Sequence, residues 1–234
     1  MADGQKANGK KPISAVSKVY LIAYNILQLI GWCKLFGRVV RHYLDDGRHD
    51  QLYAKIELDL KIFQTGAVLE IIHCAIGIVP SSVVLTAFQV FSRVFLTWGV
   101  VHSVKQSQES VGVALFVFAW TVTEMIRYSF YVFGLIGRVP YLLQWCRYTF
   151  FIVLYPIGVT GELLTIYSSL SHVKRTALYS IDLPNQANVS FSYYYYLLFI
   201  MISYLPVFPQ LYGHMLKQRK KVIGGGGAVK AKSA

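Results

Sequence analysis

Long apolar stretches, separated by short polar segments, occupy most of this chain. A helix that crosses a membrane needs roughly 20 mainly apolar residues, because each residue adds about 1.5 Å along the helix axis. We place such helices at residues 19–36, 62–79, 83–104, 111–136, 148–170 and 194–215. The pattern therefore predicts an all-α integral membrane protein, folded as a bundle of six transmembrane helices.

The composition also indicates a membrane protein. Apolar residues make up 55% of the 234 residues and charged residues only 15%, with a mean hydropathy of +0.45. Soluble domains contain roughly 25% charged residues. Ten of the 23 lysines and arginines lie in the two tails, four before the first apolar stretch and six after the last. The net charge of +12 therefore does not indicate a partner that is nucleic acid.

The two tails define the domain organisation that we expect. Residues 1–17 form a polar, basic tail predicted to be disordered, residues 18–216 form the membrane domain, and residues 217–234 form a basic, glycine-rich tail. Basic segments beside membrane spans favour the cytosolic side. Since six spans return the chain to the side on which it started, both termini are predicted to be cytosolic.

Polar side chains inside the apolar stretches are informative, because a charge at the membrane centre costs roughly 2.5–3.5 kcal/mol on insertion scales. The second, third and fourth stretches contain Glu70, Gln89, Arg93, Glu124 and Arg127, and Arg147 stands at the border of the fifth. Helices that turn these side chains inward would enclose a polar cavity. Two interpretations stay open: the acids and arginines pair with one another, or they contact a substrate.

The fifth stretch contains a candidate catalytic pair. Tyr155 and Glu162 are seven residues apart, which places them on one face of a helix, two turns apart. Pro156 would kink this helix, and Gly158 would let a substrate or another helix approach closely. Three acids against two arginines in the stretches leave one acid without a basic partner, and we assign this position to Glu162. With Tyr155 it could perform acid–base chemistry on a lipid-like substrate.

A further motif resembles part of an unrelated enzyme class. The run from His73 and Cys74 to Pro80 matches the His-Cys loop of tyrosine phosphatases, except that proline stands where the arginine should be. Arginine binds phosphate bidentately and proline cannot. We therefore predict no phosphatase activity here, and we expect a helix that ends at Pro80.

Several motifs together resemble a known family. They are LEIIH at 69–73, HCxxGxxP at 73–80, QVFSR at 89–93, EMIRY at 124–128 and RYTFFIVLYPIGVTGE at 147–162. From about residue 16 to residue 215, the chain is similar to the very-long-chain (3R)-3-hydroxyacyl-CoA dehydratases, once called protein tyrosine phosphatase-like proteins.

The resemblance implies a multi-pass enzyme of the endoplasmic reticulum membrane that acts in fatty-acid elongation. Such an enzyme removes water from a (3R)-3-hydroxyacyl-CoA and yields the trans-2-enoyl-CoA, with no metal or redox cofactor. The family's catalytic tyrosine and glutamate fall on Tyr155 and Glu162, and the coenzyme A phosphates would lie near Arg147. Expected partners are membrane lipid, the condensing enzymes, and the ketoacyl- and enoyl-CoA reductases. The alternative is a non-catalytic membrane scaffold or small-molecule transporter.

Overall fold

The computed structural model describes residues 14–45, 47–186 and 188–224, and within them every regular element is a helix. In chain order these are α1 (Ala15–Asp45), η1 (His49–Gln51), α2 (Leu52–Gly66), α3 (Val68–Ala75), α4 (Val83–Val94), η2 (Phe95–His102), α5 (Lys105–Gln108), α6 (Val111–Ile136), α7 (Tyr141–Thr149), α8 (Phe151–Thr176), α9 (Tyr193–Arg219) and η3 (Lys220–Gly224). The predicted all-α class is confirmed.

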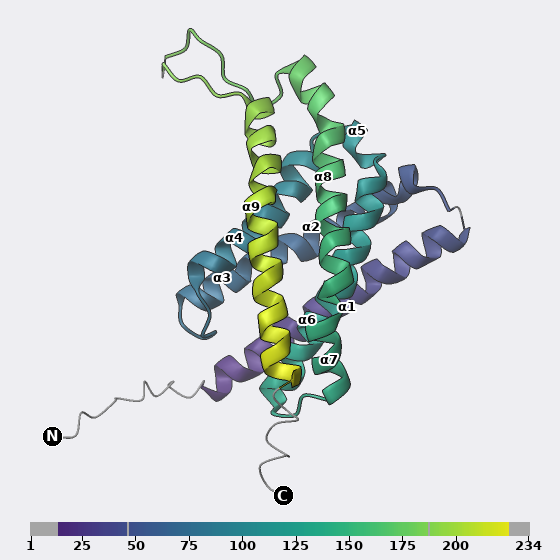
Figure 1. Ribbon diagram of the computed structural model, residues 1–234, viewed down its shortest axis with the longest axis vertical. Coiled ribbons are helices and arrows are strands. Elements are labelled where there is room, and N and C mark those ends of the chain that lie inside the picture. Colours follow the sequence, from purple (N-terminus) through teal and green to yellow (C-terminus); the bar gives the residue numbers. More distant parts are fainter. Residues whose placement is uncertain (1–13, 46, 187, 225–234) are drawn as a thin grey trace, which may run out of the picture.

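The helix α6 is the centre of the bundle and packs most extensively against α8 and α1. In Figure 1, α8 and α9 run along the long axis of the molecule, and α1 crosses them obliquely. The helices α6 and α8 meet closely at Gly112 and Gly161, because a Cβ atom added at Gly161 would lie 2.5 Å from the backbone nitrogen of Phe116. Such contact between glycines lets two membrane helices approach backbone to backbone.

Five helical segments within the described residues are long and apolar enough to cross a membrane. They are Ala15–Asp45, Val83–His102, Val111–Ile136, Phe151–Thr176 and Tyr193–Gly224. Each overlaps one of the six predicted spans, so the chain is a multi-pass membrane protein. The remaining predicted span, at residues 62–79, is divided between α2 and α3, and neither helix alone is long enough to cross.

A side chain from α1 lies at the break between α2 and α3. The Tyr24 hydroxyl donates a hydrogen bond of 3.2 Å to the backbone carbonyl of Gly66. In a continuous α-helix the amide of Glu70 would donate to this Gly66 carbonyl, but it donates to the carbonyl of Ala67 instead. The helix is therefore interrupted where a tyrosine takes the place of the usual backbone donor.

The sequence predicts a polar loop at residues 37–59, with room for a short amphipathic helix in its second half. The segment is mostly helical, because α1 and α2 extend into it from both sides. Asp59 is only 2% exposed and forms ion pairs of 3.0 Å with both Lys34 and Arg38. A buried carboxylate is tolerated when opposite charges satisfy it. The charges of this segment thus join α1 to α2.

The helix α3 ends at Ala75, five residues before the end predicted at Pro80. Gly77 has a φ of +77°, a left-handed conformation that ends helices and that glycine adopts without strain. Cys74 is 8% exposed, and its sulfur lies 3.6 Å from the Thr86 hydroxyl on α4. The residues of the phosphatase-like motif therefore pack the turn between α3 and α4.

Most of the predicted tails, residues 1–17 and 217–234, lies outside the described residues. Where they are described, both tails extend a helix. The backbone amide of Ser17 donates to the Ser14 hydroxyl at 3.1 Å, which is the hydrogen bond of a helix N-cap, and α1 begins directly after Ser14. At the other end, α9 and η3 continue as far as Gly224.

Candidate active site

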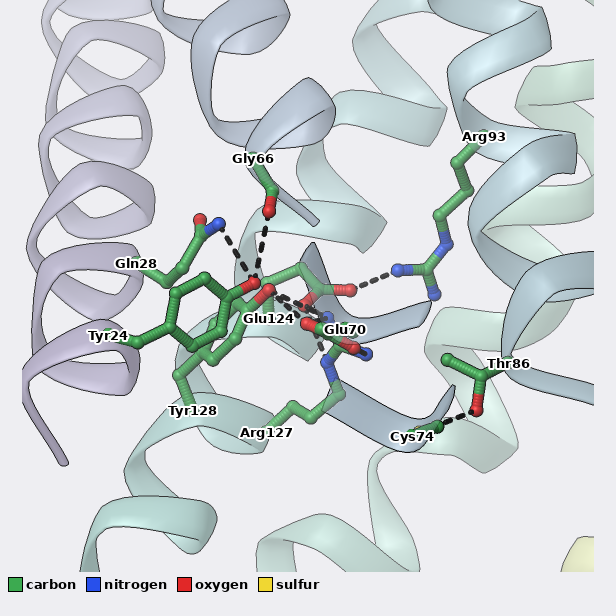
Figure 2. Close-up of polar contacts among 10 residues, drawn as sticks. All are labelled: Tyr24, Gln28, Gly66, Glu70, Cys74, Thr86, Arg93, Glu124, Arg127 and Tyr128. Atoms are coloured by element: carbon green, nitrogen blue, oxygen red, sulfur yellow. Dashed lines mark hydrogen bonds and ion pairs between the residues drawn. The ribbon is translucent and has the colours of Figure 1, made fainter. Parts of the chain in front are cut away.

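Four charged side chains from three helices form one network, which we name the charge cluster (Figure 2). Its members are Glu70 on α3, Arg93 on α4, and Glu124 and Arg127 on α6. The Arg127 guanidinium binds Glu70 bidentately, with nitrogen–oxygen distances of 2.9 and 3.0 Å. The Tyr128 hydroxyl donates to the same carboxylate at 2.6 Å. This fork is the strongest geometry available to an ion pair, and it joins α3 to α6.

Glu124 is the buried centre of the charge cluster, with 1% of its surface exposed. One carboxylate oxygen accepts a hydrogen bond from Arg93, and the other accepts one of 2.7 Å from Arg127. Among the arrangements left open by the sequence, Glu70 with Arg93 is not the pair that forms. Arg127 binds Glu70 instead, because its planar guanidinium reaches both Glu70 and Glu124.

Two cavities border the charge cluster. The larger has a volume of about 280 Å³, lies between α1, α3 and α6, and is lined mainly by apolar side chains together with Glu70 and His73. The smaller has a volume of about 20 Å³ and is lined by Gln89, Glu70 and the two arginines of the cluster. Neither of these two cavities is lined by Tyr155 or Glu162. Gln89, predicted to support the charges, is an exposed residue at the smaller cavity.

Glu162 lies on α8 and is held from two other helices. The indole nitrogen of Trp120 on α6 donates to its Oε1 at 2.9 Å, and the Tyr204 hydroxyl on α9 donates to its Oε2 at 2.5 Å. Both of these donors are uncharged. Within the described part of the chain, Glu162 is thus oriented by hydrogen bonds and has no ion pair of the kind that holds Glu124.

Tyr155 lies two turns before Glu162 on α8, a separation of about 10 Å along the axis. The tyrosine is half-buried, and its ring stacks on Phe208 and Tyr212 of α9, with centroid distances of 5.1 and 6.4 Å. We refer to Tyr155 and Glu162 as the candidate pair.

Trp120 joins the charge cluster to the candidate pair. The Arg93 guanidinium lies 5.7 Å from the centre of the Trp120 ring, while the ring nitrogen donates to Glu162. A guanidinium near an aromatic face is attracted to it. The charge cluster and the candidate pair are therefore neighbouring parts of one polar interior.

Two residues from the predicted site are not among the ion pairs that form the charge cluster. Arg147 is on α7, and its guanidinium lies 4.5 Å from the Phe130 ring centre and 5.1 Å from that of Tyr131. Gly158 is buried where α8 packs on α6, and an added Cβ atom would lie 3.4 Å from that of Ala119. Gly158 thus serves helix packing in this structure, one of the two roles considered from the sequence.

The most important contact that the sequence did not predict is that of Tyr204. Its hydroxyl is a polar group inside the apolar stretch 194–215, the same signal that singled out Tyr155. The hydrogen bond to Glu162 connects segments 42 residues apart, however, and no local pattern reports such a pairing.

No group of three or more histidine, cysteine, aspartate or glutamate side chains lies together as a possible metal site in the described portion of the chain. The carboxylates near the candidate pair instead face arginine, tryptophan and tyrosine donors. The arrangement provides hydrogen-bond donors and a carboxyl group, which are the elements of proton transfer.

Comparison with known proteins gives consistent matches. A family model described as protein tyrosine phosphatase-like protein, PTPLA, matches residues 64–225. A Mus musculus protein named very-long-chain (3R)-3-hydroxyacyl-CoA dehydratase 2 is 59% identical over 214 residues, which are 92% of this chain and 84% of the relative. Its Homo sapiens counterpart is 60% identical over 89% of this chain and 82% of its own length.

A more distant relative also matches over most of this chain. The Arabidopsis thaliana protein named very-long-chain (3R)-3-hydroxyacyl-CoA dehydratase PASTICCINO 2 is 38% identical over 90% of this chain and 96% of its own length. No solved structure matches the chain. The chain belongs to the protein tyrosine phosphatase-like family, together with these very-long-chain (3R)-3-hydroxyacyl-CoA dehydratases.

Proposed function

We propose that this chain is a very-long-chain (3R)-3-hydroxyacyl-CoA dehydratase in which Tyr155 and Glu162 perform the proton transfers. The identity to relatives of that name, about 60% over most of the chain, supports the activity. The observation that supports the residue assignment is the environment of Glu162. It is a carboxyl group inside the bundle, oriented by two neutral donors and lying on the same helix face as Tyr155.

Removal of water from this substrate is a β-elimination. The proton on C2, next to the thioester, is removed, the electron pair forms the C2–C3 double bond, and the C3 hydroxyl leaves with a second proton as water. One group must accept the C2 proton and another must donate to the leaving hydroxyl. We assign these two transfers to the candidate pair. Arg93, whose guanidinium packs near the Trp120 ring that binds Glu162, would stabilise the negative charge that develops on the thioester oxygen.

We further propose six spans with both termini in the cytosol. Taken together, α2 and α3 cover residues 52–75, about 36 Å of helix at 1.5 Å per residue, which is enough to cross the membrane with a tilt. The start of α1 and the end of α9 lie toward the same end of the molecule in Figure 1, which supports this topology. The helix α7, which contains Arg147, lies at that end, where the coenzyme A phosphates would bind.

The cellular setting follows from the same activity. We propose that the enzyme resides in the endoplasmic reticulum membrane. It receives its substrate from a ketoacyl-CoA reductase, which acts on the product of a condensing enzyme, and passes its own product to an enoyl-CoA reductase. Each of these proteins acts on a neighbouring intermediate of one elongation cycle.

The central test is a dehydration assay on purified protein. We expect Tyr155→Phe and Glu162→Gln each to lower kcat by roughly 10²- to 10⁴-fold, the range for removal of a general acid or base. The matched controls are Tyr167→Phe on α8, whose residue is 67% exposed, and Glu109→Gln, whose side chain is also exposed. Parent-like rates in both test variants would show that the assignment is wrong. Movement of substrate across sealed vesicles without dehydration would favour a transporter.

A second measurement assigns the base. In D₂O, an enzyme that removes and returns the C2 proton introduces deuterium at C2 of the substrate even when water is not lost. The variant that lacks the acid should retain this exchange, and the variant that lacks the base should lose it. The comparison of Tyr155→Phe with Glu162→Gln therefore tells which residue removes the C2 proton.

A further inference from the structure

Three aromatic residues on α9 face the candidate pair. Tyr204, Phe208 and Tyr212 are spaced at four-residue intervals, which places them on one side of the helix. We name these three residues the aromatic stripe. The other side of α9 is covered by little of the protein, since Ile202 and Leu205 are 63% and 74% exposed. The stripe is therefore the face that α9 turns toward α8.

We propose that the aromatic stripe positions both reacting side chains, with Tyr204 orienting the Glu162 carboxyl group and Tyr212 orienting Tyr155. The proposal rests on the catalytic roles assigned to Tyr155 and Glu162 above. It makes the three stripe residues positioning residues, because each acts through one of the candidate pair.

The first contact fixes the carboxyl group of Glu162. Tyr204 donates to Oε2 at 2.5 Å, and Trp120 donates to Oε1 at 2.9 Å from the opposite helix. Two donors from two helices define the plane of the carboxyl group. Each oxygen still has a second lone-pair direction in which it could meet a substrate. Since both donors are neutral, the carboxyl group is held in place and remains free to exchange a proton.

The second contact fixes the backbone below Tyr155. Pro156 has no amide hydrogen, so the carbonyl of Ile152, which a helix would pair with residue 156, lacks its usual donor. The Tyr212 hydroxyl donates to this carbonyl at 3.3 Å. Tyr212 therefore supplies a donor to the carbonyl that Pro156 leaves unpaired, three residues before the proposed catalytic tyrosine.

The third contact is a stack of three rings. The Tyr155 ring lies nearly parallel to Phe208, at 17°, and to Tyr212, at 5°. Phe208 and Tyr212 lie 5.6 Å apart and also stack, at 18°. A ring packed against two parallel aromatic rings has few rotamers available. The direction of the Tyr155 hydroxyl is thus set by α9.

The decisive variant is Tyr204→Phe, which removes one oxygen atom and keeps the ring. A hydrogen bond to an ionisable group is lost, so we expect kcat to fall about 10- to 100-fold. KM should change by less than about threefold, because Tyr204 acts on Glu162 rather than on substrate binding. The matched control is Tyr195→Phe, the same substitution on α9 at a residue that is 70% exposed, and it should retain the parent kcat. Tyr212→Phe should lower kcat less, about threefold to tenfold, since its ring remains stacked.

A double variant separates positioning from a general structural role. Glu162→Asp withdraws the carboxyl group from Tyr204 by one methylene, so Tyr204→Phe should have little further effect on kcat in that background. An equal loss in both backgrounds, or a parent-like kcat in Tyr204→Phe alone, would overturn the positioning role and leave the proposed function standing. A parent-like kcat in Glu162→Gln would instead overturn the catalytic role assigned to Glu162, and this inference with it.

Discussion

The charge cluster and the candidate pair lie side by side, and their acidic groups have hydrogen-bond partners of different charge. In the cluster, Glu70 and Glu124 both have guanidinium partners. In the candidate pair, Glu162 has a tryptophan and a tyrosine, and both donors are neutral. Both regions lie in the same helical bundle, and Glu70 and Glu162 are both partly buried. Burial alone therefore does not explain why one has a guanidinium partner and the other does not.

The difference separates two uses of a buried acid. An ion pair satisfies a carboxylate and holds it in one state, which suits a group that joins helices. Neutral hydrogen bonds orient a carboxyl group and leave it able to gain or lose a proton, which suits a group that reacts. The comparison predicts that substitutions in the charge cluster mainly lower the free energy of unfolding. Substitutions in the candidate pair should mainly lower the rate of dehydration.

The largest effect is expected for Glu162→Gln. The amide keeps the shape of the side chain, so the folded state should unfold at the parent temperature, while kcat falls by roughly 10²- to 10⁴-fold. Thermal unfolding and dehydration are measured on the same preparation in detergent. A variant that unfolds early and retains its rate per folded molecule would reverse the roles of the two regions.

The opposite result is expected for Glu124→Gln. Without this carboxylate, Arg93 and Arg127 lose their shared partner in a buried place, and the free energy of unfolding should fall by about 3–5 kcal/mol. The measurement is again thermal unfolding of the purified protein, with Glu109→Gln as the control for the same substitution at an exposed residue. An unchanged unfolding temperature would contradict a structural role for the cluster.

A smaller effect is expected for Glu70→Gln. Arg127 loses a bidentate partner but keeps Glu124, so stability should fall by about 1.5–3 kcal/mol, the range for a hydrogen bond to a charged group. The dehydration rate of the folded fraction should stay within several-fold of the parent rate. A rate loss as large as that of Glu162→Gln would show that Glu70 takes part in the chemistry, the alternative that the sequence left open.

The smallest effect is expected for Asp50→Asn, outside the bundle. Arg48 binds Asp50 at 2.6 Å and lowers the pKa of this carboxyl group below its ordinary value of 3.8. The ion pair therefore contributes above pH 3.8 and is lost as the pH falls through the lowered pKa. Because Arg48 is exposed and the Asp50 side chain is 32% exposed, water screens the pair, and we expect the same unfolding temperature as the parent at pH 7. A clear shift at pH 7 would contradict this reading.

The sequence predicts most of the fold because membrane helices depend on long apolar stretches that can be read directly. The sequence does not predict which charged side chains form buried ion pairs between helices. Asp59 looks like part of a polar loop, and only the structure shows it between Lys34 and Arg38. The break near Gly66 is equally hidden, since its cause is a tyrosine on another helix.

The same limit applies to the site. Seven-residue spacing on one helix is sufficient to place Tyr155 and Glu162 on a shared face, because both belong to a single element. Which side chains meet Glu162 depends on how α6 and α9 pack against α8. No pattern within one helix predicts the hydrogen bond from Tyr204. The catalytic roles of Tyr155 and Glu162 stay predictions until they are measured.

Chemical rescue tests the central claim most directly. In Glu162→Ala the carboxyl group is removed, and small carboxylic acids such as formic acid can be supplied in its place. The account predicts a dehydration rate at least about 100-fold below the parent and a rise in that rate with formate concentration. The same variant dehydrating substrate at the parent rate before any formate is added would contradict the account.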